Sequence, residues 1–125
     1  MESYISTGFF FFFLYNDLES VITIASVTLN GTTQKVTLAK SLIEYSGQYK
    51  FISLELQTND GSSYYTNAST QYPLKLFIDS VARTIRASYN NGTYYWAGIN
   101  RYNDTVINVS CSSNFVANAV IRVFN

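Results

Sequence analysis

The chain contains no histidine, which removes the usual general base near neutral pH and the commonest neutral metal ligand. Its only cysteine is Cys111, so an internal disulfide and a zinc site built on several cysteines are both excluded. The only proline is Pro73, which argues against a proline-rich linker. These scarcities remove the Ser-His-Asp and Cys-His arrangements of nucleophilic catalysis.

Charged side chains are also scarce. They make up 13% of the chain, against roughly 25% in an average soluble domain. Eight Lys and Arg balance eight Asp and Glu, whereas nucleic-acid binders usually carry a basic surplus, so we expect no nucleic-acid partner. A surface with so few charges is expected to be partly covered by other copies of the chain or by neighbouring proteins.

Other signs of a catalytic site or of a ligand-binding motif are missing. The carboxylates are spread singly, and none of them forms an evident glycosidase pair. There is no glycine-rich phosphate loop, and the spacing of the aspartates does not match a calcium loop. The sequence therefore predicts no catalytic residue, no cofactor and no metal, and favours a protein that binds or assembles over an enzyme.

The longest apolar run lies near the start of the chain. It has no preceding Lys or Arg, and it is far shorter than the roughly 20 residues that span a bilayer. We therefore expect neither a signal peptide nor membrane insertion. Alternate side chains of a strand point to opposite faces, so we interpret the run as a strand buried on both sides and residues 1–16 as a docking strand. The predicted assembly interface comprises Phe9, Phe10, Phe11, Phe12 and Phe13.

Strand-forming residues dominate the rest of the chain. Aromatic residues make up 17%, and β-branched residues are plentiful. Turn signals recur at the spacing of roughly 8–12 residues that is typical of sandwiches and barrels. The sequence predicts one all-β domain over residues 1–125, an antiparallel, jelly-roll-like β-sandwich. Strands are predicted at 20–29, 33–38, 49–56, 74–78, 81–89, 93–99, 105–111 and 115–124, with a short helical turn within 38–45.

Three polar clusters predict turns. Asn30-Gly31 is a strong hairpin signal because both residues tolerate positive φ, and the cluster at 90–92 is a second. A third turn is predicted at 59–61. The last strand carries apolar residues on both faces, which predicts a central or inter-subunit position. Cys111 is interpreted as a small buried residue beside Ile107 and Val109.

Aromatic residues gather around the predicted loops. Tyr and Trp offer a flat apolar surface with a polar edge, which suits a sugar ring or a protein contact, and neighbouring Asn side chains can bind hydroxyl groups. The alternative is that many of these rings point into the core. The candidate receptor- or glycan-binding residues are Tyr64, Tyr65, Asn90, Asn91, Tyr94, Tyr95, Trp96, Tyr102 and Asn103.

Five N-x-[ST] motifs occur, at Asn30, Asn67, Asn91, Asn103 and Asn108. A chain this rich in Asn, Ser and Thr produces several such motifs by chance, so we interpret them as coincidental rather than as glycosylation sites.

The order of several segments resembles the small β-domains at the tips of bacteriophage tail fibres. The segments are Val36 to Tyr45, Tyr49 to Leu56, the hairpin from Arg86 to Tyr95, Val106 to Val109, and Val120 to Phe124. The resemblance covers about Leu29 to Asn125. It implies a homotrimer on the exterior of a phage particle, in contact with other virion proteins and with a glycan or protein of the host surface.

Three alternatives stay open. A fibre tip normally follows a long shaft, so the chain is alternatively a capsid-decorating or small tail protein docked through the Phe9 to Phe13 strand. A free carbohydrate-binding module or lectin, secreted from the cell, would use the same aromatic loops. A purely structural domain would use its aromatic residues for subunit contacts alone.

Overall fold

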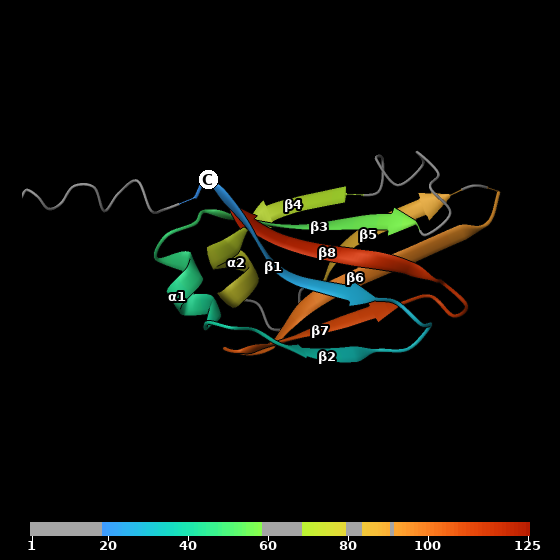
Figure 1. Ribbon diagram of the computed structural model, residues 1–125, viewed down its shortest axis with the longest axis horizontal. Coiled ribbons are helices and arrows are strands. Elements are labelled where there is room, and N and C mark those ends of the chain that lie inside the picture. The colour runs from blue at the N-terminus through green and yellow to red at the C-terminus, as the bar shows by residue number, and fades with distance from the viewer. Residues whose placement is uncertain (1–18, 59–68, 80–83, 91) are drawn as a thin grey trace, which may run out of the picture.

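A computed structural model of the chain describes residues 19–58, 69–79, 84–90 and 92–125. Two four-stranded sheets, with strand orders β1-β8-β3-β4 and β2-β7-β6-β5, pack face to face, and every strand pair is antiparallel (Figure 1). The predicted antiparallel all-β sandwich is confirmed. The strands are β1 Val21–Thr28, β2 Gln34–Thr37, β3 Phe51–Thr58, β4 Ser69–Pro73, β5 Ile85–Asn90, β6 Tyr94–Asn103, β7 Val106–Cys111 and β8 Ala117–Phe124.

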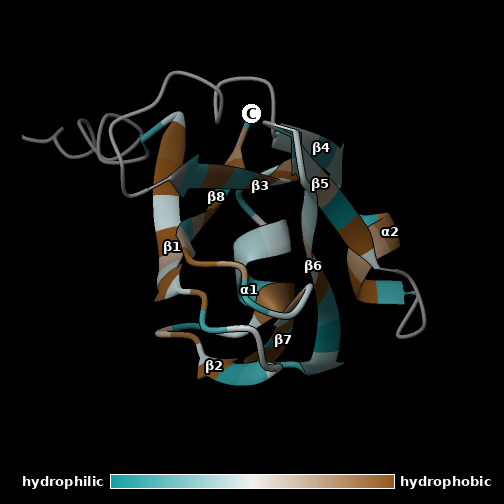
Figure 2. Cartoon of the chain, turned by 90° about the vertical axis from the view of Figure 1, so that its right-hand side faces the viewer, coloured by the Kyte–Doolittle hydropathy of each residue, from teal (hydrophilic) through white to brown (hydrophobic). Residues whose placement is uncertain are grey.

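The core lies between the inner faces of the two sheets. In β3, the alternate residues Ile52, Leu54 and Leu56 are fully buried, as their two-residue period predicts. Figure 2 shows the same alternation as hydrophobic segments interrupted by polar ones along the strands. Strand β8 lies between β1 and β3, which confirms the central position predicted from its two apolar faces.

Two short helices, α1 (Leu42–Ser46) and α2 (Leu74–Asp79), lie together at one end of the sandwich (Figure 1). The hydroxyl group of Ser41 accepts a hydrogen bond of 3.0 Å from the Glu44 backbone N–H and so caps the start of α1. Leu42 and Tyr45 of α1 are buried. The short helical turn predicted within residues 38–45 is therefore confirmed, although α1 begins at Leu42.

Residues 74–78 form a helix, so the predicted strand there is wrong. Leu74 and Phe77 are fully buried, whereas Leu76 is 50% exposed. Residues three apart share one face of a helix, which explains why Leu74 and Phe77 point inward together. The strand was predicted from the two-residue spacing of Leu74, Leu76 and Ile78. That prediction did not take Phe77 into account. Strand β4, which precedes the helix, was not predicted.

The Asn30-Gly31 segment does not close a hairpin, contrary to the prediction. Strand β1 pairs with β8, and β2 pairs with β7, so this segment crosses from one sheet to the other. Its turn chemistry is nevertheless as expected. Gly31 has a φ of +83°, and the Asn30 side-chain oxygen accepts hydrogen bonds from the backbone N–H (3.1 Å) and the hydroxyl group (2.6 Å) of Thr32.

The second predicted hairpin is confirmed, because β5 and β6 pair with Asn90 opposite Tyr94. Cys111 is partly exposed, so its predicted burial is wrong. It is the last residue of β7, where the sandwich covers it less than it covers Ile107 and Val109.

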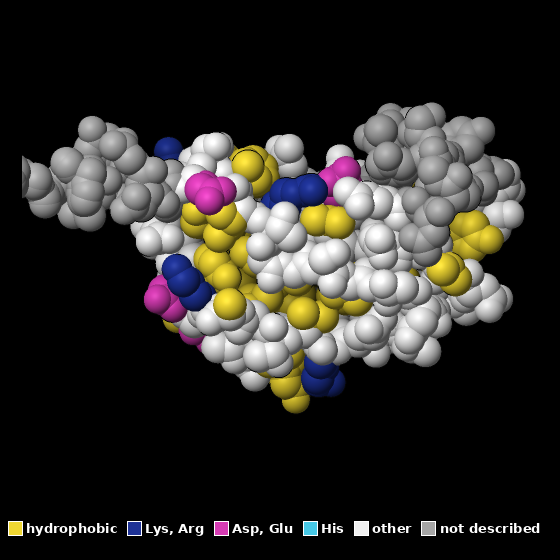
Figure 3. All heavy atoms as spheres, viewed as in Figure 1, with side chains coloured by type: hydrophobic (Ala, Val, Ile, Leu, Met, Phe, Trp, Pro, Cys, Tyr) yellow, Lys and Arg dark blue, Asp and Glu magenta, His cyan; other side chains and the backbone are white. Residues whose placement is uncertain are grey.

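Several predicted features lie outside the described residues. They are the docking strand with Phe9 to Phe13, the turn at 59–61, Tyr64, Tyr65, Asn67, Asn91 and residues 81–83 of a predicted strand. Within the described ranges, no helix has the length and apolarity needed to cross a bilayer. On the side of β1 and β2, Figure 3 shows a band of apolar side chains bordered by polar ones, with few charges.

Candidate binding face

The outer face of the β2-β7-β6-β5 sheet brings together aromatic, cationic and amide side chains. Paired residues of neighbouring strands point to the same side of a sheet. Ile99 and Val109 are paired and fully buried, so the residues that alternate with them point outward. We call this outer surface the aromatic face. Its residues include Lys35 of β2, Asn108 and Ser110 of β7, Tyr94, Trp96, Gly98, Asn100 and Tyr102 of β6, and Arg86 and Ser88 of β5.

A cation–aromatic pair lies at the β5–β6 side of the aromatic face. The guanidinium carbon of Arg86 lies 4.9 Å from the centroid of the Trp96 ring. Beside it, the hydroxyl groups of Ser88 and Tyr94 lie 2.9 Å apart and share a hydrogen bond. Tyr94 is 56% exposed, so its ring is available to a ligand. This part of the face therefore presents two aromatic side chains and a cation in adjacent positions.

Gly98 gives the neighbouring side chains room on this surface. A Cβ atom at Gly98 would lie only 2.5 Å from the Thr84 methyl group and 3.9 Å from the Trp96 ring. The absence of a side chain thus lets Thr84 and Trp96 both lie over the strand. The Trp96 backbone N–H also donates a hydrogen bond of 3.1 Å to the Ser112 hydroxyl group, which ties this part of β6 to the residue that follows β7.

A second cation–aromatic pair lies at the other side of the sheet. The Lys35 Nζ atom is 4.6 Å from the centroid of the Tyr102 ring, which is exposed. The pairing of β6 with β7 shifts register between Arg101 and Asn103, and Tyr102 occupies this irregularity. A single register shift therefore positions an aromatic ring next to the lysine of a strand two places away.

The sheet that carries the aromatic face is positively charged. Its four strands contain no Asp or Glu, and Lys35 and Arg86 lie on the aromatic face, whereas Arg101 pairs with the buried Ile107 and belongs to the other side of the sheet. The Oδ1 atom of Asn108 is buried and has no hydrogen-bond partner within the described part of the chain. Because this atom is shielded from solvent, the accessible hydrogen-bonding groups of the face are instead the hydroxyl groups of the exposed residues Ser88 and Tyr94. The face can therefore offer stacking, cationic contacts and hydrogen-bond acceptance.

The structure separates the predicted site residues into groups. Tyr94, Trp96 and Tyr102 belong to the aromatic face. Tyr95 points the opposite way, and its ring stacks on those of Phe115, at a centroid distance of 5.0 Å, and Tyr89, at 6.4 Å. Because successive residues of a strand face opposite sides, Tyr95 and Trp96 do not share a surface.

The two described asparagines of the predicted site support turns. The Asn90 side-chain oxygen accepts a hydrogen bond of 2.9 Å from the Gly92 backbone N–H. That of Asn103 accepts one of 2.9 Å from the Thr105 backbone N–H. Both are local contacts that hold the chain in a turn.

Sequence reasoning missed several residues of the aromatic face. They are Lys35, Ser88, Gly98, Asn100, Asn108 and Ser110, together with Arg86 as a partner of Trp96. The alternation of β5 does place Arg86 and Ser88 on one side of their strand. The pairing of β2 with β7 had no local signal, so the position of Lys35 on the same sheet was not predictable.

No family model, curated protein or solved structure matches this chain. In the described ranges, no group of three or more Cys, Asp, Glu or His side chains is arranged to hold a metal ion. The fold and the face together define a β-sandwich whose second sheet presents a basic, aromatic outer surface.

Proposed function

We propose that this chain is a receptor-binding domain of a phage virion protein and that it binds a host-surface saccharide through the aromatic face. The virion setting rests on the resemblance of the segments between Leu29 and Asn125 to fibre-tip domains. The binding role rests on one observation, the two cation–aromatic pairs on an outer sheet face without Asp or Glu. The proposed domain binds its ligand and does not transform it.

A saccharide fits the chemistry of this surface. Sugar rings have apolar faces that stack on Trp and Tyr, and their hydroxyl groups pair with amide and hydroxyl side chains. Tyr94 and Trp96 provide the rings, and the exposed hydroxyl groups of Ser88 and Tyr94 provide hydrogen-bonding groups beside them. The cations Lys35 and Arg86 favour a saccharide that carries carboxylate, sulfate or phosphate groups.

A free carbohydrate-binding module is the second candidate, because the aromatic face would serve it equally well. The two candidates differ in where the protein is found. Mass spectrometry of purified phage particles from the source of the sequence would detect the chain if it is a virion protein. Its absence from the particles, together with its presence in the culture medium, would favour the free module.

We expect Trp96→Ala to weaken saccharide binding at least about fivefold, because removal of a central Trp from a binding surface costs more than about 1 kcal/mol. The saccharide would first be identified on a glycan array that includes acidic glycans and then titrated by calorimetry. Arg86→Gln is expected to weaken binding of acidic glycans and to reduce its dependence on salt concentration.

Leu76→Ala is a suitable control, because Leu76 is an exposed apolar residue of α2 and is not part of the aromatic face. Its variant should bind the saccharide as the unaltered chain does. If Trp96→Ala and Arg86→Gln both leave binding unchanged, the aromatic face is not the binding site. If no glycan on the array binds the unaltered chain, the saccharide proposal fails.

A further inference from the structure

A row of apolar residues crosses the outer face of the other sheet. Val21 of β1 pairs with Phe124 of β8, Phe124 pairs with Phe51 of β3, and Phe51 pairs with Pro73 of β4. Val21 is 45% exposed and Phe51 is 36% exposed, and the Phe51 and Phe124 rings stack with a centroid distance of 5.4 Å. We call these four residues the apolar row. Side by side on one face, they form an exposed apolar patch of the kind that marks protein contacts.

The same outer face becomes polar away from this end. Two residues along from the row, Arg122 donates a hydrogen bond to the Glu55 carboxylate and forms an ion pair with it. Ser53 and Gln71 are paired on the same face. The apolar surface is therefore confined to the end of the sheet at which β1 begins.

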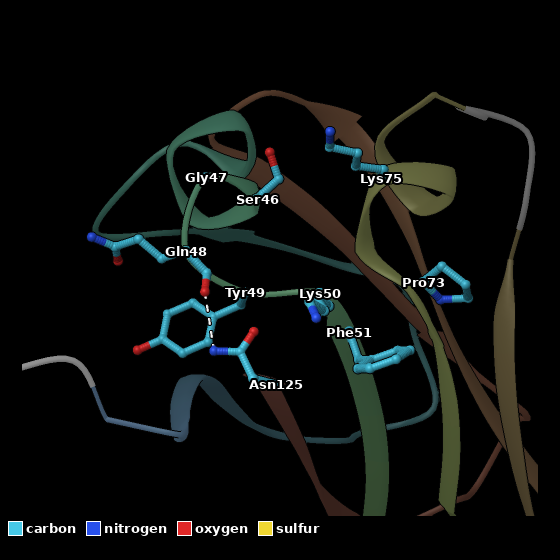
Figure 4. A pocket seen from close by; sticks show the side chains of 9 residues that line it. All are labelled: Ser46, Gly47, Gln48, Tyr49, Lys50, Phe51, Pro73, Lys75 and Asn125. Atoms are coloured by element: carbon cyan, nitrogen blue, oxygen red, sulfur yellow. Dashed lines mark hydrogen bonds between the residues drawn. The ribbon is translucent and has the colours of Figure 1, made fainter. Parts of the chain in front are cut away.

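A groove of about 540 Å³ adjoins the apolar row. Figure 4 shows Phe51 and Pro73 on one side of this groove, with Lys50 nearby and Lys75 projecting from α2. The Asn125 side chain donates a hydrogen bond of 3.1 Å to the Gln48 carbonyl oxygen and so links the end of the chain to the groove wall. Among the described residues, those that line the groove include Lys50 and Lys75 but no Asp or Glu, so their charge is positive.

The residues that precede β1 have the complementary composition. Residues 9–14 are five Phe and one Leu, and residues 1–20 contain Glu2, Asp17 and Glu19 but no Lys or Arg. Residues 1–18 lie outside the described part of the chain, which they join two residues before the start of β1 at Val21, itself a member of the row. An apolar segment with acidic neighbours thus precedes a strand whose first residue belongs to the apolar row, and the adjoining groove is lined by two lysines.

We propose that the Phe9 to Leu14 segment of one copy packs on the apolar row and groove of a second copy. In an extended segment, alternate side chains point to opposite sides, so a segment folded back on its own domain would leave half of its rings exposed. Contact between copies covers both sides, one against the row and the other against the neighbouring copy's segment. This contact gives the chain a self-association surface on the sheet opposite the aromatic face.

The lengths are compatible with this exchange. The row crosses four strands, a span of roughly 14 Å at the usual strand spacing. The seven residue steps from Leu14 to Val21 reach up to roughly 24 Å. The segment is therefore long enough to extend beyond its own domain, and the negative charges of Asp17 and Glu19 complement the positive charges of Lys50 and Lys75.

The test is the mass of the full chain in solution, measured by sedimentation across a concentration series. The unaltered chain is expected to associate, and the number of copies will show whether the complex is a dimer or the trimer that the fibre-tip resemblance implies. A row variant, Val21→Ser with Phe51→Ser, and a segment variant, with Phe9 to Phe13 all replaced by Ser, should each weaken association at least about tenfold.

A mixture of the two variants separates exchange between copies from a contact within one chain. The row variant has an intact segment and the segment variant has an intact row, so the two are expected to bind each other. Val116→Ser serves as the control, because Val116 is exposed but is not part of the row. Its association should equal that of the unaltered chain.

Charge reversal provides a second test if the row variant fails to fold. Lys50→Glu with Lys75→Glu is expected to weaken association, and Asp17→Lys with Glu19→Lys should restore it. An unaltered chain that stays monomeric would overturn the proposal, and so would association that persists in both the row and the segment variants. Binding of a monomeric chain to neutral lipid vesicles through the Phe segment would assign that segment to a membrane surface instead.

Discussion

Replacing Phe77 with alanine is expected to lower the free energy of unfolding by about 3–5 kcal/mol, the usual cost of truncating a buried aromatic side chain. Phe77 is a fully buried residue of α2, whereas its neighbour Leu76 is 50% exposed. Leu76→Ala is therefore expected to change the free energy by no more than about 0.5 kcal/mol. Both residues belong to one six-residue helix. The difference between the two variants in free energy of unfolding therefore reports the burial of the side chain rather than its place in the chain.

Urea unfolding followed by circular dichroism provides the measurement. A typical small domain is stable by about 5–15 kcal/mol, so the loss at Phe77 will shift the midpoint visibly. If residues 74–78 instead formed a strand with Leu74, Leu76 and Ile78 on its inner face, Leu76→Ala would be the more damaging change. A larger effect at Leu76 than at Phe77 would therefore contradict the helix.

The strands that could be predicted from the sequence are those with a clear two-residue period. Strand β3 was found because Ile52, Leu54 and Leu56 alternate with polar residues, and all three are fully buried. The helix α2 was missed because three leucine and isoleucine residues at a two-residue spacing are too few to exclude a helix. In a helix, the buried residues are three apart. The spacing of apolar residues distinguishes a strand from a helix only when the segment is long enough for the two spacings to differ.

Strand pairing could not be predicted, and this limited the candidate site. The Asn30-Gly31 signal is local and correctly placed a turn, but the strands on either side find their partners in β8 and β7. Lys35 reaches the aromatic face only because of the second of these pairings. The contact between Lys35 and Tyr102 depends on the pairing of strands that lie far apart in the chain.

The aromatic cluster was predicted in composition but not in orientation. Tyr95 and Trp96 are adjacent, so at most one of them can face outward from the sheet. The choice depends on the partner strand, where Tyr89 lies opposite Tyr95 and provides a buried ring for it to stack on. Trp96 then pairs with Ser88 and faces outward.

The two proposed surfaces belong to different sheets. The aromatic face is the outer side of β2-β7-β6-β5, and the apolar row is on the outer side of β1-β8-β3-β4. Association through the row therefore leaves the aromatic face uncovered. An assembly of several copies would present several aromatic faces at once, which strengthens binding to a surface with many identical saccharides.

Gly31→Ala is expected to lower the free energy of unfolding by about 2–3 kcal/mol, for two reasons that add. Gly31 has a φ of +83°, a region that alanine adopts only at a cost. A Cβ atom at this position would also lie 3.0 Å from the Asn114 backbone nitrogen. Asn114 itself has a φ of +65°, so the crossover from β1 to β2 meets a second constrained turn and cannot move away easily.

Gly92→Ala is the matched control, because Gly92 has a φ of +96° but its added Cβ would have no atom of the other described residues within 4 Å. Its substitution should cost only the conformational part, about 1 kcal/mol. The difference between the two variants measures the contact between the Gly31 turn and the backbone at Ser113 and Asn114. Equal losses in urea unfolding would show that this contact is absent and that the crossover is free to adjust. A larger loss at Gly31 would show that the two turns lie too close together to accommodate an added methyl group.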